Sequence, residues 1–180
     1  MARSSRQKHD YNTASTDRAK ELQSIYKIGE FTEWDAETHS KESARIYKFG
    51  CGLTDVNGVA LRGILVDMAV LVGTKVEFSN TRATLFELDK DTRQKVRVIQ
   101  VENRQPIDEK GGINHEVWPH MHFGQDYKKL GRDIGSHEMT VQQTLDFFAN
   151  EANIYFNPEV HCDFEAENFQ LTPLRYHGKL

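Results

Sequence analysis

The chain has few of the residues that mark secreted, membrane-spanning or disulfide-bonded proteins. Its two cysteines, Cys51 and Cys162, are too few for a scaffold held by several disulfides, and they fit a reducing compartment. No apolar run approaches the ~18 residues that a membrane helix requires. Residues 1–20 contain no apolar segment of the kind found in a secretory leader. We therefore expect a cytoplasmic protein that does not associate with a membrane.

Positive charge is also scarce. The chain of 180 residues has 23 Lys and Arg against 27 Asp and Glu, a net charge of −4. This balance argues against a general nucleic-acid coat and confines any contact with phosphates to a local basic patch. Residues 1–15 are polar and basic and lack apolar periodicity, so we predict a flexible arm followed by a single domain over residues 16–180.

The apolar pattern predicts an α+β fold in which an antiparallel β-meander of about five strands carries an N-terminal and a C-terminal helix. The first helix is expected to begin at Thr16 and to end near Gly29. The second follows Thr140, which forms the pattern of a capping box with Gln143. The tail beyond it is rich in aromatic residues but has no regular pattern.

Turn signals divide the meander into hairpins. Asn57-Gly58 favours a tight turn between two strands, because both residues tolerate positive φ angles. The expected register pairs Cys51 with Ile64, Phe49 with Val66, and Lys48 with Asp67. A second hairpin is expected to join residues 75–88 to residues 95–102. A further short strand is expected within residues 117–124, followed by a polar loop.

Histidine is the one residue type that stands out. The chain has eight histidines, and four of them lie between positions 115 and 137: His115, His120, His122 and His137. Because side chains alternate along a strand, His120 and His122 are expected to share one face, with Met121 and Phe123 on the other. Two imidazoles on a rigid strand suit proton transfer, or they suit binding of a metal ion.

The leading hypothesis from these residues is a metal-independent nuclease or related phosphodiesterase. In it His120 and His122 exchange protons, and His137 positions one of the two imidazoles. Basic residues after the strand neutralise the phosphate, and an aromatic residue before it contributes to substrate binding. These substrate-binding candidates are Lys128 with its neighbour Lys129, Arg132 and Trp118. This hypothesis needs no cofactor and takes RNA or a nucleotide as substrate.

Two alternatives stay open. The first is a zinc site formed by His120, His122 and His137 together with a carboxylate. The second is a non-catalytic binding protein, such as an antitoxin, an immunity protein or an inhibitor of a host defence system. Beyond these alternatives we expect a protein partner for the chain, and the sequence leaves open whether it forms a homodimer.

Residues 119–123, with the sequence PHMHF, and the helix that follows resemble a set of small bacterial and phage families. Many of these families are uncharacterised and some are encoded in toxin–antitoxin loci. The shared layout is a P-H-x-H strand, a loop, and an amphipathic helix that ends near Asn153-Ile154. The resemblance implies a role in a toxin or defence system that acts on RNA. It carries over only His120 and His122.

Two other motif resemblances do not extend to a complete site. The PHMHF segment is similar to the second metal motif of LytM-type zinc endopeptidases. Those enzymes also need an upstream H-x-x-x-D pair, and none of the upstream histidines here has Asp four residues later. The segment is also similar to the histidine-triad nucleotide hydrolases, but Gly124 stands where their third histidine is required.

Overall fold

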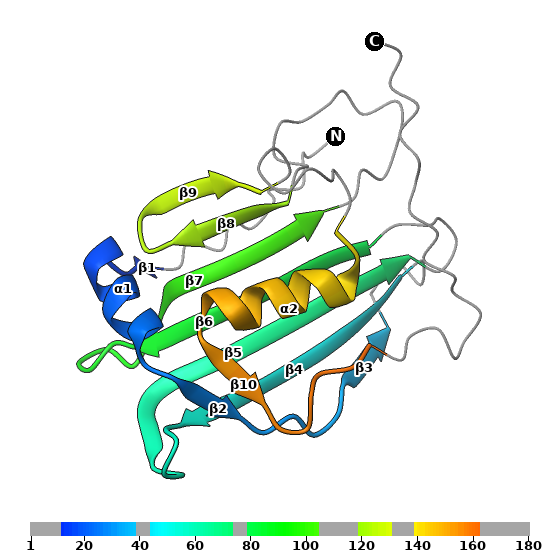
Figure 1. Cartoon of the computed structure of the whole chain (residues 1–180). Helices are drawn as coiled ribbons and strands as arrows, with labels where there is room; N and C mark the ends of the chain where they lie inside the picture. The colour runs from blue at the N-terminus through cyan, green and yellow to red at the C-terminus, as the bar shows by residue number, and fades with distance from the viewer. Residues whose placement is uncertain (1–11, 39–43, 74–78, 105–118, 131–138, 163–180) are drawn as a thin grey trace.

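The computed structural model describes residues 12–38, 44–73, 79–104, 119–130 and 139–162. In these ranges the chain forms one large sheet and two helices (Figure 1). The long strands are β4 (Ala44–Thr54), β5 (Ala60–Gly73), β6 (Ser79–Leu88) and β7 (Lys95–Arg104). The short strands are β1 (Asn12–Thr13), β2 (Lys27–Gly29), β3 (Asp35–Thr38), β8 (His120–Phe123), β9 (Asp126–Lys129) and β10 (Ile154–Phe156). The helices are α1 (Thr16–Ser24) and α2 (Val141–Glu151).

The predicted five-stranded antiparallel meander with a helix at each end is wrong, because the sheet is mixed and has ten strands. The strands follow the order β10-β2-β4-β5-β6-β7-β8-β9, with β1 beside β7 and β3 beside β4. Two pairs are parallel, β1 with β7 and β10 with β2. The sequence does not reveal these additions because such short strands carry little periodicity. Parallel pairing also joins segments that lie far apart in the chain.

The first helix is shorter than the sequence predicts. α1 ends at Ser24 rather than near Gly29, and residues 27–29 form β2 instead. Because β2 is held between β10 and β4, pairing within the sheet overrides the local helical pattern. Residues 12 and 13, within the predicted arm, form β1 beside β7. Residues 1–11 of that arm lie outside the described residues.

The second helix begins where the sequence predicts. The hydroxyl of Thr140 accepts a hydrogen bond from the amide of Gln143 at 3.1 Å, and the Gln143 side chain accepts one from the amide of Thr140 at 2.9 Å. This capping box is confirmed. α2 ends at Glu151, before the expected end, because Asn153 adopts a φ of 53° that breaks the helix and leads into β10. Among the described residues, neither helix is long and apolar enough to cross a membrane.

The hairpin between β4 and β5 is present, but its register differs from the predicted one. Its turn covers residues 55–59, with the amide of Asp55 donating to the carbonyl of Val59 at 2.9 Å, and is therefore longer than a two-residue turn. The observed pairs are Cys51 with Val66, Phe49 with Met68, and Lys48 with Ala69. Each partner has moved by two residues, so all side chains keep their faces, but Lys48 and Asp67 are not opposite each other. The second predicted hairpin joins β6 and β7 at residues 89–94.

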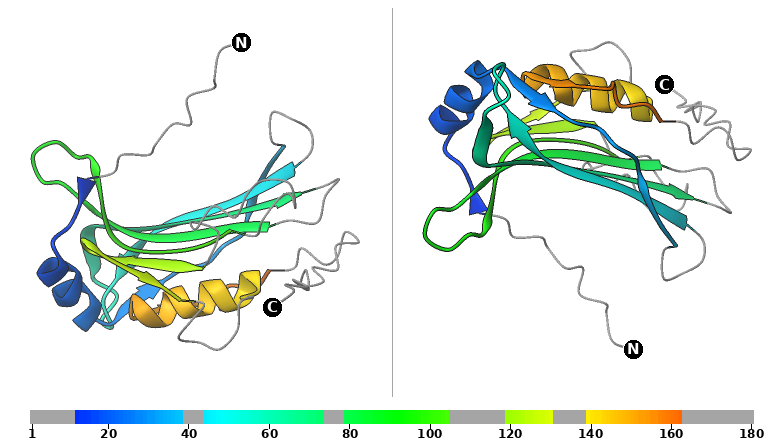
Figure 2. Two further views of the ribbon diagram at one scale, coloured as in Figure 1. Left: turned by 90° about the horizontal axis from the view of Figure 1, so that it is seen from above. Right: turned by 90° about the horizontal axis from the view of Figure 1, so that it is seen from below.

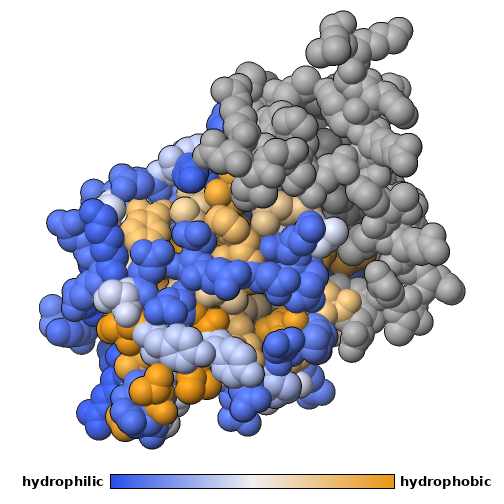
Figure 3. Space-filling model, viewed as in Figure 1, coloured by the Kyte–Doolittle hydropathy of each residue, from blue (hydrophilic) through white to orange (hydrophobic). Residues whose placement is uncertain are grey.

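α2 covers one face of the sheet, and the apolar core lies between them (Figure 2). Leu145 and Phe148 project from α2 into this core and are buried. The strand residues that face α2 and are fully buried include Val66, Val70, Ala83, Leu85, Ile99 and Val101. On the outer side of α2 hydrophilic side chains predominate, with apolar ones showing beside the helix (Figure 3). The helix is therefore amphipathic, and its apolar stripe attaches it to the sheet.

The opposite face of the sheet is polar where it crosses β6, β7 and β8. No helix of the described residues lies over this face (Figure 2). Rows of paired residues run across the strands there, and one row places Thr84 beside Gln100, which in turn lies beside His122. The sheet thus separates an apolar side under α2 from a polar side that carries the two strand histidines.

Candidate active site

Strand β8 lies between β7 and β9, and its register brings polar residues from three strands together. The cross-strand pairs are His120 with Glu102, His120 with Lys129, His122 with Gln100, and His122 with Tyr127. Directly paired residues point to the same face of a sheet, so this group lies on the face opposite α2. Met121 points to the α2 side and is buried in the core, as alternation along the strand requires.

His120 is buried beside a buried carboxylate. Its Nε2 lies 3.4 Å from Oε2 of Glu102, and both side chains are only 8% exposed. The same Oε2 accepts a hydrogen bond from the side-chain amide of Gln100 at 3.3 Å. A carboxylate next to an imidazole fixes the orientation of the ring and favours a proton on the facing nitrogen. Glu102 therefore acts on His120 as a positioning residue.

His122 is half-buried and lies closer to solvent. Its ring centroid is 5.3 Å from that of His120 and 5.2 Å from that of Tyr127, which is exposed at the edge of the group. Burial, followed by the positive charge of Arg97, lowers the pKa of His122 to about 4. The imidazole is consequently neutral near pH 7, the form that can accept a proton, but the lowered pKa also makes it a weaker base than a free histidine.

Arg97 links the site to the N-terminal strand. Its Nη2 donates to the hydroxyl of Thr13 at 3.1 Å, and its Nη1 donates to the side-chain oxygen of Gln100 at 3.5 Å. Its Nε is buried and has no hydrogen-bond partner among the described residues. Burial also lowers the pKa of Arg97. A buried guanidinium nitrogen without an acceptor is unusual, because an unsatisfied donor is costly.

The structure brings together only part of the predicted site. His120 and His122 lie side by side, whereas Lys128 shares the face of Met121 and so points away from the histidines. Lys129 is on the histidine face in its place. The predicted roles of Trp118, Arg132 and His137, and also of His115, fall outside the described residues.

Four residues of the group were not identified from the sequence: Arg97, Gln100 and Glu102 on β7, and Tyr127 on β9. A signal for two of them was present in the sequence. Gln100 and Glu102 are separated by one residue within a strand of β-branched residues, so both point to the same face of a central strand. Polar residues at alternate positions of a strand otherwise rich in β-branched residues indicate a buried polar cluster.

The zinc alternative depended on His137 as a third ligand. Within the residues that the structure describes, no group of three His, Cys, Asp or Glu side chains is placed to hold a metal ion. The geometry of His120, His122 and Glu102 suits proton transfer, which requires only that the imidazoles and the carboxylate lie close together.

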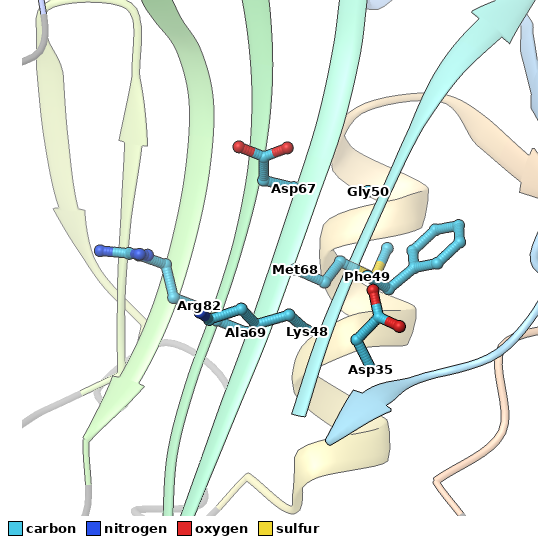
Figure 4. Close-up of a pocket in the computed structure, with 8 residues that line it drawn as sticks. All are labelled: Asp35, Lys48, Phe49, Gly50, Asp67, Met68, Ala69 and Arg82. Carbon is cyan, nitrogen blue, oxygen red and sulfur yellow. The ribbon is translucent and has the colours of Figure 1, made fainter. Parts of the chain in front are cut away.

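A shallow hollow lies beside this group on the same side of the sheet. Its cavity volume is about 270 Å³, and it is lined by Asp35, Lys48, Phe49, Gly50, Asp67, Met68, Ala69 and Arg82 (Figure 4). Arg82 is paired across the strands with Glu102, so it connects the hollow to the histidine group.

Comparison with known proteins identifies no relative. No family model matches the chain, and neither a curated protein nor a solved structure is significantly similar to it. The function is consequently inferred from the geometry of the site.

Proposed function

We propose that this protein is a metal-independent phosphodiesterase that cleaves RNA, with His120 and His122 as its acid–base pair. One observation carries the proposal. Two imidazole rings lie 5.3 Å apart on one strand face, with a buried carboxylate beside His120 and the charge of Arg97 acting on His122. Paired groups that can give and take protons are the main requirement of general acid–base catalysis.

RNA supports this chemistry because it carries its own nucleophile, the 2′-hydroxyl. Neutral His122 takes the proton of that hydroxyl as the 2′-oxygen bonds to phosphorus. The bond from phosphorus to the 5′-oxygen breaks, and His120 returns a proton to that oxygen. The products are a 2′,3′-cyclic phosphate and a free 5′-hydroxyl, so the reaction needs only proton transfers.

Arg97 would stabilise the transition state. Negative charge accumulates on the phosphate oxygens as the 2′-oxygen attacks, and a guanidinium donor in a partly desolvated site is well suited to bind it. The Nε of Arg97 is buried and has no partner among the described residues, so a shift of the side chain that brought it to the phosphate would break no existing bond of that nitrogen. Glu102 keeps the His120 ring in place during proton transfer.

The biological setting follows from the resemblance of the PHMHF strand and its helix to toxin–antitoxin and phage families. We infer a cytoplasmic toxin or defence nuclease whose activity a protein partner restrains.

The test is cleavage of labelled single-stranded RNA by protein purified without a histidine tag, in the presence of EDTA. Replacing His122 or His120 by Gln is expected to reduce kcat/KM by about 10²–10⁴-fold, because each removes one partner of the proton transfers. The matched control is His161→Gln, an exposed histidine outside the group.

Three results would count against the proposal. Wild-type protein that leaves RNA intact would contradict it, as would a double His120→Gln, His122→Gln variant with full activity. Cleavage that disappears on addition of EDTA would favour the metal alternative.

A non-catalytic binding protein is the second candidate. The observation that favours it is the burial of His120 and Glu102. A histidine and a glutamate that only stabilise the sheet would be buried in the same way. In that case the wild-type protein does not cleave RNA, and the histidine variants bind their protein partner as well as the wild type does.

A further inference from the structure

A row of charged side chains crosses the sheet through the histidine group. In strand order it consists of Arg82 on β6, Glu102 on β7, His120 on β8 and Lys129 on β9. Neighbouring strands lie ~4.8 Å apart, so the row extends over roughly 14 Å. Glu102 is in contact with His120, which leaves a cation at each end of the row.

These two end cations have no acidic partner among the described residues. None of the ion pairs found there involves Arg82 or Lys129. Lys129 is exposed and Arg82 is half-buried. Figure 4 shows the guanidinium of Arg82 directed away from Asp35, on the side of β6 where β7 lies. Both charges are therefore available to an anion that reaches the histidine group.

The other described lysines on this part of the face are already paired. Lys48 forms an ion pair with Glu37 at 2.5 Å, and Lys95 forms one with Asp67. Neither of these two lysines is therefore as available to a polyanion as Lys129 is. This distribution explains how a chain with a net negative charge can present a local site for a polyanion.

An aromatic side chain lies at the outer edge of the same strip. Tyr127 is 48% exposed, and its ring lies within about 5.4 Å of both histidine rings. The faces of exposed aromatic rings stack on unpaired nucleic-acid bases with little preference for sequence. A base in a duplex is already stacked and is not free for this contact.

We propose that single-stranded RNA binds across strands β6 to β9 along this strip. Arg82 and Lys129 contact the phosphates that flank the scissile one, and Tyr127 stacks on a base. The proposal deepens the proposed function, on which it rests for the position of the scissile phosphate between the two histidines. Arg82 and Lys129 are binding residues and take no part in proton transfer.

The test is binding of a fluorescein-labelled, fully 2′-O-methylated single-stranded RNA, measured by anisotropy at several salt concentrations. This probe lacks the 2′-hydroxyl and is not cleaved. Arg82→Ala and Lys129→Ala are each expected to weaken binding and to reduce the slope of log Kd against log salt by about 0.7, the value for one lost phosphate contact on a single strand. Tyr127→Ala is expected to weaken binding about tenfold without changing the slope.

The chain offers matched controls for both kinds of contact. Lys128→Ala removes an exposed lysine that is adjacent to Lys129 but on the other face of β9. Tyr155→Ala removes a tyrosine with 45% exposure on β10, at the far end of the sheet from Tyr127. Neither control is expected to change the affinity or the slope. Circular dichroism of every variant excludes loss of fold as a cause.

The outcomes separate this proposal from the proposed function. If the slope of log Kd against log salt is the same for the wild type, Arg82→Ala and Lys129→Ala, RNA does not bind along the strip, even if the protein cleaves RNA. A wild type that does not bind the probe contradicts the proposal in the same way. Reduced slopes in a protein that leaves natural RNA intact support the strip and overturn the catalytic role. Equal affinity for a double-stranded probe contradicts the contact between Tyr127 and an unpaired base.

Discussion

Two cations with buried nitrogen atoms lie toward opposite ends of the sheet, and their surroundings differ. Lys27 on β2 is fully buried, and its Nζ donates to the carbonyls of Ile25 at 2.6 Å and Ala152 at 2.7 Å. Arg97 on β7 is half-buried, with a buried Nε that has no partner among the described residues. Burial lowers the pKa of both residues, to about 8 in the case of Lys27.

On the proposed function, the difference separates a structural cation from one that binds the substrate. Ala152 follows the last turn of α2, where carbonyl groups lack helical partners and the helix dipole favours positive charge. The buried ammonium of Lys27 donates a hydrogen bond to the carbonyl of Ala152 and so provides a partner at that end of the helix. The Nε of Arg97 has no acceptor among the described residues, and its charge acts on the neutral imidazole of His122. This arrangement is expected where a substrate anion accepts the remaining hydrogen bond.

The same substitution at both cations gives the sharpest test of this comparison. Arg97→Met is expected to lower kcat/KM for RNA cleavage by at least about 100-fold, because it removes the group that stabilises charge in the transition state. Lys27→Met is expected to leave kcat/KM within a factor of about two, since Lys27 lies far from the histidines in the strand order. Similar losses of activity in both variants would show that the two cations do not differ in role.

The end of the sheet that carries the site also depends on a close backbone contact. Gly124, in the turn between β8 and β9, has a φ of 56°, and an added Cβ would lie 2.7 Å from the backbone of Thr16. Gly124→Ala is expected to lower the free energy of unfolding by about 2 kcal/mol or more, measured by urea denaturation. Gly58→Ala is the control, since Gly58 also has positive φ but open space around it. An equal loss in both variants would mean that backbone conformation alone explains the effect.

Lys27 predicts a dependence of stability on alkaline pH. Its pKa is about 8 in the folded protein and 10.5 when unperturbed, so between these values the unfolded chain binds more protons. The contribution of Lys27 to the free energy of unfolding therefore rises with pH over that window, by up to ~1.4 kcal/mol per pH unit. The difference in stability between the wild type and Lys27→Met is expected to show this rise. A difference that stays constant with pH would contradict the lowered pKa.

His122 predicts a similar dependence of stability at acidic pH. Its pKa is about 4 in the fold against 6.5 unperturbed, so folding disfavours its protonated form. Stability is expected to rise between about pH 4 and pH 6.5, because the unfolded chain binds more protons there. The difference between the wild type and His122→Gln isolates this contribution from that of the carboxylates. A difference that is flat over this window would mean that burial and the charge of Arg97 do not lower the pKa of His122.

Prediction from the sequence succeeded where a signal is local. Thr140 and Gln143 are three residues apart, and their capping box is present at the start of α2. The β4–β5 and β6–β7 hairpins also follow from turn residues and alternating strands. The same reasoning missed β2, because three residues provide too little pattern to outweigh a neighbouring helix signal. It also missed that β10 follows α2 and pairs with β2 in parallel.

The candidate site likewise has one part that follows from the local sequence and another part that depends on how distant segments pair. Alternation along a strand places His120 and His122 on one face whatever the rest of the chain does, since this follows from backbone geometry. Their partners on β7 depend on the register between β7 and β8, and that register is set by packing of the whole sheet. The register also decided that Lys129, rather than Lys128, lies beside His120. The sequence by itself thus determined the two histidines and their common face, whereas only the tertiary structure brought Glu102 and Arg97 to them, because residues distant in the chain meet only when the sheet forms.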